Sequence, residues 1–154
     1  MSEKRFKYYV EDFHVGMVIE QPGPTLPEED ILEFARRYDP QPIHLDKEAA
    51  KRSIYGGLIA SGWQTASLTT RMMCDSYLLD SSSLGSPGMK EVSWPRPVRP
   101  GDTLRLRMTV LETKPSRSKP DRGSVLHRWE VFNQAGEPVL RMEGTGLFKR
   151  RNPA

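Results

Sequence analysis

The sequence predicts an α+β fold in which one antiparallel sheet wraps around one buried helix. Three observations lead to this prediction. Helical periodicity is confined to the first half of the chain, the longest helix is apolar on most of its sides, and alternation with period two fills the second half. Because 154 residues are the size of one ordinary domain, we expect a single domain over residues 1–154, with its core at about 12–148.

A short strand and a helix are the first predicted elements. Met17–Ile19 is the strand candidate, and Pro22–Pro24 is expected to break regular structure after it. Thr25 and Glu28 have the spacing of a capping box, so a helix should begin there. The helix should end at Asp39, because a residue that precedes a proline is disfavoured in the α region.

Two further helices are expected before the strands. Asp46 can cap a short helix through Lys47–Ala50. The longest helix should begin at Ser61, whose spacing to Gln64 again fits a capping box, and should reach Leu79. Its apolar side chains cover more than one face, which is typical of a buried helix.

The second half of the chain predicts four strands. In Thr103–Lys114, apolar residues alternate with Arg and Thr, as in a half-buried antiparallel strand. Segments rich in Pro, Gly and Asn separate the elements. The other three strands are predicted at Lys90–Trp94, Ser124–Phe132 and Pro138–Lys149.

Composition limits the setting and the partners of the protein. The lone Cys74 cannot form an intramolecular disulfide, so a reducing, cytoplasmic location is expected. The N-terminus is too charged for a signal peptide, and no apolar run approaches the roughly 20 residues of a membrane span. The net charge of +3 is spread along the chain, and the cluster Lys149–Arg151 has the character of a solvated tail. Neither a membrane nor a nucleic acid is therefore expected as a partner.

The densest group of chemically useful residues follows the first predicted helix. It places the carboxylate of Asp39 and the imidazole of His44 five residues apart, in a loop that two prolines stiffen. A carboxylate at a helix C-terminus meets the negative end of the helix dipole, which suggests a functional use. The residues alone leave a structural explanation open, in which Asp39 pairs with Arg36 or Arg37 and His44 is an ordinary loop histidine.

A second group lies at the start of the longest helix. If Ser61 and Gln64 cap each other, the amides of Gly62 and Trp63 stay free at a helix N-terminus, where a negatively charged oxygen is favoured. Gly62 would also let a ligand approach closely. The alternative is that Gly62 is small because the helix packs tightly against the sheet.

Taken together, the stretch from Phe34 to Gly62 resembles the MaoC-like acyl dehydratases and (R)-specific enoyl-CoA hydratases. Their signature is Asp-x-Asn-Pro-(Ile/Leu)-His-x-Asp, followed further along by Gly-x-(Ile/Val)-Ala-His-Gly. This sequence has Asp39-Pro40-Gln41-Pro42-Ile43-His44-Leu45-Asp46 and then Gly57-Leu58-Ile59-Ala60-Ser61-Gly62. Gln41 replaces the usual Asn and Ser61 the usual His, but the amide and a capping group are kept. A looser resemblance extends over residues 12–148.

The resemblance implies a single hot-dog fold and a hydro-lyase, which adds water to a 2-enoyl-CoA or removes it from a 3-hydroxyacyl-CoA. Asp39 and His44 would be its catalytic pair and would hold one water between them. The Gly62 amide would stabilise the enolate-like oxygen of the thioester. Ser61 and Gln41 are expected beside the substrate. Ser67 sits where similar enzymes keep a serine near the acyl chain, although packing within the helix is the simpler explanation.

The resemblance also has implications for cofactors and partners. No metal and no cofactor are expected, and coenzyme A enters only as part of the acyl-CoA substrate, its phosphates received by basic side chains. Hot-dog sheets pair edge to edge, and the active sites of the family lie near that interface. We therefore expect a homodimer or a higher homo-oligomer. Tyr55, Trp63 and the segment Leu78–Gly88 are candidates for shaping the acyl pocket.

Two other classes of function stay open. A thioesterase on the same fold would use a carboxylate to direct water at the thioester carbonyl, and release of free thiol from acyl-CoA would identify it. A noncatalytic acyl-binding protein, which the departures at Gln41 and Ser61 make credible, would bind the ligand without turnover. The remaining candidates have structural explanations: His14 is expected on the surface, His127 in the core or an interface, and Cys74 in helix packing.

Overall fold

The computed structural model describes residues 5–152 and is built on one antiparallel sheet. Its five strands have the order β1-β3-β4-β5-β2, and each pairs antiparallel with its neighbours. The strands are β1 (Val18–Thr25), β2 (Ser83–Ser93), β3 (Thr103–Pro115), β4 (Arg122–Phe132) and β5 (Pro138–Lys149). β1 and β2 therefore form the two edges of the sheet.

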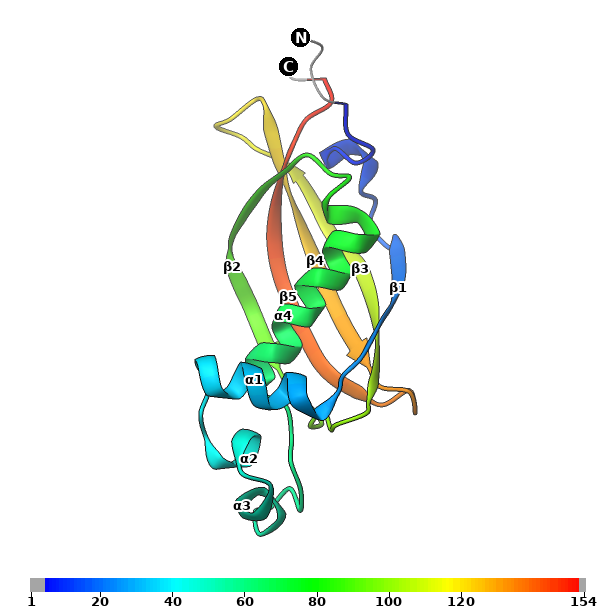
Figure 1. The fold of residues 1–154 in the computed structure, drawn as a ribbon. Helices are drawn as coiled ribbons and strands as arrows, with labels where there is room; N and C mark the ends of the chain where they lie inside the picture. The colour runs from blue at the N-terminus through cyan, green and yellow to red at the C-terminus, as the bar shows by residue number, and fades with distance from the viewer. Residues whose placement is uncertain (1–4, 153–154) are drawn as a thin grey trace.

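One long helix lies across the sheet, and most of the shorter helices gather at one end of it (Figure 1). The long helix is α4 (Gly62–Met73), which continues into a π-helical turn, η2 (Cys74–Leu78). The others are η1 (Val10–Asp12), α1 (Glu28–Tyr38), α2 (Pro42–Leu45) and α3 (Lys47–Lys51). Helices α1 to α3 lie at the end of the sheet opposite the two termini (Figure 1). The predicted α+β architecture, a sheet around one central helix, is confirmed.

The core lies between α4 and the sheet. Alternate side chains of β3 and β4 are buried, so the predicted alternation of these strands is confirmed. Thr65, Thr69 and Met72 form part of the buried face of α4. The residues that β3 and β4 bury include Leu104, Leu106, Met108, Val110, Val125, His127, Trp129 and Val131.

The long helix is central, as predicted, but in the single chain only one of its faces is buried. Trp63 is 59% exposed, and Ser67 and Thr70 are also on the surface. The sheet covers only one face of α4, because it curves around the helix without closing over it (Figure 1). The apolar residues that the sequence places on the opposite face are left at the surface of the single chain.

Both edge strands depart from the sequence predictions. Thr25 was expected to cap a helix, but it ends β1, and its Oγ1 lies 2.7 Å from Oγ1 of Thr103. β1 runs through Pro22–Pro24 because an edge strand tolerates proline where no ladder hydrogen bond is needed. β2 begins at Ser83, well before the predicted Lys90–Trp94, and its pairing with β5 is irregular. The start of β2 was not predicted because it is rich in glycine, serine and proline, and glycine and proline are uncommon in strands.

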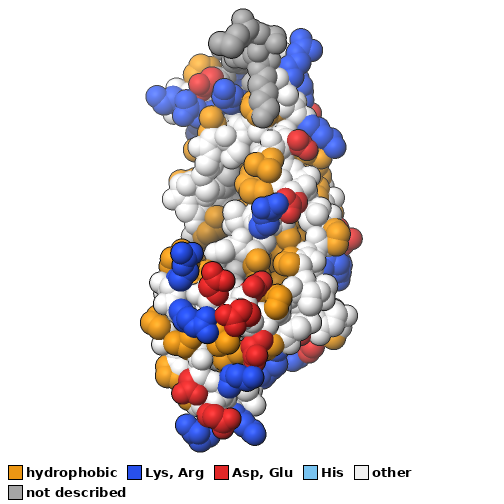
Figure 2. All heavy atoms as spheres, viewed as in Figure 1, with side chains coloured by type: hydrophobic (Ala, Val, Ile, Leu, Met, Phe, Trp, Pro, Cys, Tyr) orange, Lys and Arg blue, Asp and Glu red, His pale blue; other side chains and the backbone are white. Residues whose placement is uncertain are grey.

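Charged side chains of both signs cover the face shown in Figure 2. Acidic side chains gather over α1, whose first turn carries Glu28, Glu29 and Asp30. Basic side chains are scattered around them, so this face carries no single basic patch (Figure 2). Within residues 5–152, no helix is long and apolar enough to cross a membrane.

Candidate active site

Asp39 lies at the C-terminus of α1. The helix ends at Tyr38, as predicted, and the amide of Asp39 donates to the carbonyl of Ala35 at 3.0 Å. The chain then forms α2, a single helical turn that the sequence analysis treated as a loop. Pro42 occupies its start, where proline is favoured because its missing N–H is not needed. This turn brings His44 back toward Asp39.

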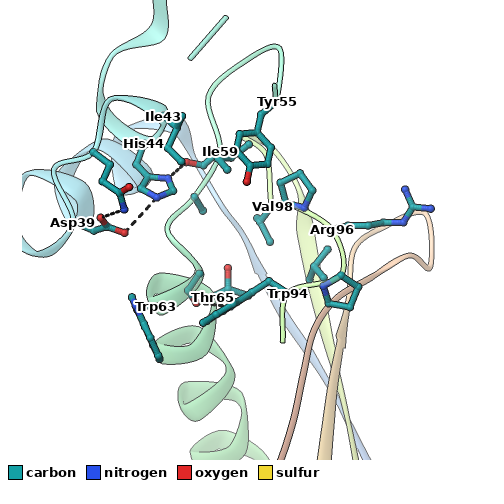
Figure 3. A pocket seen from close by; sticks show the side chains of 16 residues that line it. Asp39, Ile43, His44, Tyr55, Ile59, Trp63, Thr65, Trp94, Arg96 and Val98 are labelled. Atoms are coloured by element: carbon teal, nitrogen blue, oxygen red, sulfur yellow. Dashed lines mark hydrogen bonds and ion pairs between the residues drawn. The ribbon is translucent and has the colours of Figure 1, made fainter. Parts of the chain in front are cut away.

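Asp39 and His44 form the predicted pair (Figure 3). The Nε2 atom of His44 lies 3.3 Å from Oδ2 of Asp39, and its Nδ1 lies 2.9 Å from the carbonyl oxygen of Ile59. Since a carbonyl oxygen only accepts, Nδ1 carries a proton and donates it to Ile59. Nε2 is therefore the ring atom at which His44 can exchange a proton with a substrate or with Asp39. The side chain of His44 is buried, at 5% exposure.

Two further donors hold the carboxylate of Asp39. Nε2 of Gln41 donates to Oδ1 at 2.7 Å, and Oγ of Ser61 donates to Oδ2 at 2.7 Å. Burial tends to raise the pKa of Asp39. The hydrogen bonds from Gln41 and Ser61, together with the attraction of His44, outweigh burial and hold the pKa below its ordinary value. The carboxylate therefore stays ionised at neutral pH, and its orientation is fixed on both oxygens.

The structural explanation for Asp39 from sequence is wrong. Arg36 binds Glu29 at 3.0 Å, and within residues 5–152 no ion pair joins Asp39 to Arg36 or Arg37. The cost of a carboxylate at a helix C-terminus is offset instead by the donors at the site.

Ser61 caps α4, but without the predicted partner. Its Oγ accepts from the amide of Trp63 at 3.3 Å, whereas the side chain of Gln64 donates to the carbonyl of Asp30 at 3.0 Å. The reciprocal capping box is therefore wrong, and the amide of Trp63 is not free. The amide of Gly62 has no hydrogen-bond partner within the described part of the chain. It remains available at the helix N-terminus, where anionic oxygen is favoured.

Trp94 packs directly against Gly62. Its indole Nε1 donates to the carbonyl of Gly62 at 2.9 Å, and a Cβ added to Gly62 would lie only 2.5 Å from Cε2 of the indole. The ring of Trp63 stands nearly perpendicular to Trp94, with their centroids 5.1 Å apart. Gly62 is thus small because an indole covers it, and the predicted packing against the sheet is corrected to packing against Trp94.

A cavity of about 360 Å³ opens beside the Asp39–His44 pair. Helix α4 contributes Gly62, Trp63 and Thr65 to it. Its full wall consists of Asp39, Gln41, Ile43, His44, Tyr55, Ile59, Ala60, Gly62, Trp63, Thr65, Trp94, Pro95, Arg96, Pro97, Val98 and Val139. The cavity brings together side chains from both ends of the signature and from the segment after β2.

The predicted site residues occupy different positions around this cavity. Gln41 and Gly62 line it, and Ser61 is buried behind Asp39, to which it donates. Ser67 lies outside it, on the exposed face of α4, and donates to the carbonyl of Trp63 at 2.8 Å. Ser67 therefore makes the contact within the helix that the simpler explanation expected, and its placement near the acyl chain stays a prediction.

Of the other pocket candidates, Tyr55 and Trp63 line the cavity, but the segment Leu78–Gly88 does not. Thr65 and Trp94 also line the cavity, although neither was predicted from the sequence. Thr65 follows Gly62 by almost one helical turn, so the spacing in the sequence could have indicated that the two residues share a face of the helix. Nothing in the sequence brings Trp94 back to Gly62, since that contact depends on where β2 ends.

The remaining histidines match their predictions. His14 is exposed, and His127 is a core residue, 1% exposed. Cys74 begins η2 and is partly buried, in agreement with a packing role. None of the three lines the cavity.

Comparison with known families and structures identifies similar proteins. The family model described as "MaoC like domain" matches residues 12–127. A MaoC-like dehydratase structure from Rhodospirillum rubrum is 41% identical, with a TM-score of 0.88, covering 94% of this chain and 99% of that chain. The R-hydratase PhaJ1 structure from Pseudomonas aeruginosa is 25% identical, with a TM-score of 0.69, covering 95% and 92%. The sheet and central helix are thus the hot-dog fold that the resemblance implied.

Curated relatives include proteins with and without a stated activity. "Uncharacterized protein YdeM" of Bacillus subtilis is 28% identical over 141 residues, covering 92% of this chain and 99% of the relative. The "3-hydroxybutyryl-CoA dehydratase" of Methylorubrum extorquens is 31% identical over 116 residues, covering 72% and 69%. Similarity therefore extends over most of the length of both proteins.

Proposed function

Because the chain belongs to the MaoC-like domain family, we propose that it is an acyl-thioester hydro-lyase, which hydrates a 2-enoyl-CoA or dehydrates a 3-hydroxyacyl-CoA. The observation that carries the proposal is the contact between Asp39 and His44 on the wall of a cavity, beside the free amide of Gly62. The names of two similar proteins, a 3-hydroxybutyryl-CoA dehydratase and an R-hydratase, support the same reaction class.

In the proposed hydration, one water in the cavity is bound by both catalytic side chains. The ionised carboxylate of Asp39 takes a proton from the water, and the water oxygen forms a bond to C3 of the enoyl group. In the reactive form both ring nitrogens of His44 carry protons, and Nε2 donates its proton to C2, which becomes saturated. Transfer of the proton from Asp39 to Nε2 across their 3.3 Å contact restores the pair. Dehydration follows the same steps in reverse.

The helix N-terminus supports the charge that develops on the substrate. As water adds to C3, negative charge builds on the thioester oxygen, and the amide of Gly62 can donate to it. Removing one donor of this kind from an enzyme costs about 10²–10³ in kcat. Gln41 and Ser61 act on Asp39 rather than on the substrate, since both donate to its carboxylate. The proposed reaction uses no metal ion and no cofactor, and coenzyme A takes part only as the carrier of the acyl group.

We expect the working protein to be a homodimer or a larger homo-oligomer. The outer edge of β2 has no strand beside it among residues 5–152, and Leu84 and Met89 of this strand are 42% and 43% exposed. An unpaired edge with apolar side chains is a template for pairing with another strand. Light scattering should give the mass of a dimer or larger oligomer, and Leu84→Lys should shift it toward one chain. A wild-type mass of one chain would contradict the expectation.

A cytoplasmic location stays a prediction from the lone Cys74.

The catalytic assignment is tested by following loss of enoyl absorbance with a panel of 2-enoyl-CoA thioesters. Asp39→Asn and His44→Ala should each lower kcat/KM by about 10³ or more, because each removes one of the two groups that move protons. Asp75→Asn and His14→Ala are matched controls at exposed positions outside the cavity, and both should retain wild-type rates.

The other outcomes separate the alternatives. Release of free thiol without hydration would indicate a thioesterase. Tight binding of acyl-CoA, with no turnover of any thioester, would indicate an acyl-binding protein. Unchanged hydration in both Asp39→Asn and His44→Ala would contradict the assignment of the pair.

A further inference from the structure

The wall of the cavity that faces Asp39 and His44 carries a hydroxyl with no protein partner. Thr65 is 1% exposed, and its oxygen points from α4 into the cavity (Figure 3). Within residues 5–152, Oγ1 of Thr65 forms no hydrogen bond. The other hydroxyls of α4 behave differently: Ser67, Thr69 and Thr70 each donate to the carbonyl oxygen four residues earlier. Thr65 could donate to the carbonyl oxygen four residues earlier in the same way, but its hydroxyl faces the cavity instead.

Tyr55 supplies a second hydroxyl from the opposite side. Figure 3 shows its phenol oxygen pointing from the loop before α4 into the same cavity. The backbone of Tyr55 is held on both sides, since its amide donates to Oγ of Ser53 at 3.1 Å and its carbonyl accepts from Nη2 of Arg99 at 2.6 Å. The hydroxyl itself has no partner within the described chain. Two hydroxyls thus point inward on a wall where an alkyl chain would need none.

The cavity is also short along α4. Gly62, Trp63 and Thr65 line it, but no residue further along the helix does. Thr65 lies three residues beyond Gly62, a rise of about 4.5 Å. When the thioester oxygen binds the Gly62 amide, an acyl chain of only a few carbons spans the distance from Gly62 to Thr65. Trp94, Val98 and Val139 close the space around it.

Among residues 5–152, Arg96 is the only lysine or arginine that lines the cavity. Arg96 reaches the cavity wall, but its guanidinium points away (Figure 3) and pairs with Glu137 at 3.0 Å. The ionised carboxylate of Asp39 lies on the same cavity. A second carboxylate, on the substrate, would therefore meet repulsion without a counterion, whereas a neutral oxygen would meet only hydrogen-bonding groups.

We propose that the acyl group of the substrate is short and carries a neutral oxygen, a hydroxyl or keto group, near its fourth carbon, where the hydroxyls of Thr65 and Tyr55 bind it. This inference rests on the proposed hydratase function and specifies its substrate class. A site that hydrogen-bonds a substrate oxygen rejects an analogue that lacks it, because the buried polar groups are then left without partners.

The test compares kcat/KM for three thioesters of similar length: 4-hydroxycrotonyl-CoA, 2-pentenoyl-CoA, and the monothioester fumaryl-CoA. The wild type should prefer the 4-hydroxy substrate over 2-pentenoyl-CoA by about ten- to a hundredfold, the effect of one or two hydrogen bonds to buried hydroxyls. Thr65→Val, which keeps the shape and removes the hydroxyl, should abolish most of this preference: kcat/KM should fall for the 4-hydroxy substrate and rise for 2-pentenoyl-CoA, which no longer leaves the Thr65 hydroxyl without a partner. Tyr55→Phe should reduce the preference in the same direction.

Thr70→Val is the matched control, because Thr70 is an exposed threonine of the same helix and should leave both rates unchanged. A wild-type preference for 2-pentenoyl-CoA or fumaryl-CoA would overturn this inference and leave the hydratase function standing. An equal loss with all substrates in Thr65→Val would also overturn it, since Thr65 would then act on a part that they share. Failure of the wild type to hydrate any 2-enoyl thioester would overturn the proposed function itself.

Discussion

The free energy of unfolding should depend on pH because of His127, which lies in the core without a normal hydrogen bond. Its ring stacks on Trp129 at 4.8 Å between centroids, and within residues 5–152 neither ring nitrogen has a partner of good geometry. Burial lowers the pKa of His127 from 6.5 to about 4. Backbone groups of Gly144 and Val125 oppose this effect only in part. Folding therefore keeps the imidazole neutral at a pH where the unfolded chain would protonate it.

The sign and the size of the effect follow from these two values. Between pH 6.5 and about 4 the unfolded chain binds more protons than the folded chain, so stability falls as the pH falls through this window. A difference of roughly 2.5 pKa units, at 1.36 kcal/mol for each unit, corresponds to a loss of roughly 3 kcal/mol. Above the window, His127 is neutral in both states and contributes no pH dependence.

Urea denaturation at a series of pH values measures this contribution. His127→Leu places an apolar side chain of similar size in the core. It should remove the part of the pH dependence of the free energy of unfolding that His127 causes. The difference between wild type and variant should grow by roughly 3 kcal/mol from about pH 7 to about pH 4. Parallel curves for the two proteins over this range would refute the reasoning, because His127 would then titrate alike in the folded and unfolded chains.

Two further predictions concern the site. Ser61→Ala should lower kcat about ten- to a hundredfold and move the acidic limb of the pH–rate profile to higher pH, since Asp39 loses a donor that lowers its pKa. Ser61→Thr should restore both, and an unmoved limb in Ser61→Ala would count against this role. Gly62→Ala should displace Trp94, because the added Cβ would lie 2.5 Å from its ring, and should reduce kcat/KM at least tenfold with little change in helical content by circular dichroism. Wild-type activity would show that the indole position is unimportant.

Local sequence signals predicted the parts of the fold that depend on local physics. Asp39 before a proline ended α1, and Asp46 capped α3 as expected. The alternation in Thr103–Lys114 gave the buried face of β3, because period two places every second side chain on the same side of a sheet. These features need no knowledge of distant residues.

Features that depend on tertiary contacts were missed. Pro22–Pro24 reads locally as a break, but its place at the edge of the sheet allows β1 to continue through it. Gln64 was assigned to a capping box, whereas the contact between α4 and α1 gives it a partner in Asp30. The cover that Trp94 provides for Gly62 joins residues 32 positions apart, and no spacing rule predicts it.

The candidate site was predicted better than its surroundings. The spacing of Asp39 and His44 was sufficient because α2 is short and stiffened by proline, so only one local path connects them. The role of Ser61 as a donor to Asp39 required the position of α4 relative to α1, which the sequence does not contain. Thr65 was overlooked because a threonine within a helix usually donates to the helix itself.

The proposed reaction adds water across the carbon–carbon double bond of an acyl thioester. The most direct measurement is the position of isotope after turnover of the best 2-enoyl thioester in water enriched in oxygen-18, read by mass spectrometry of the product. Hydration should place the label in a hydroxyl group on C3 of an intact thioester. Label in a free carboxylate, with the double bond retained and thiol released, would contradict it.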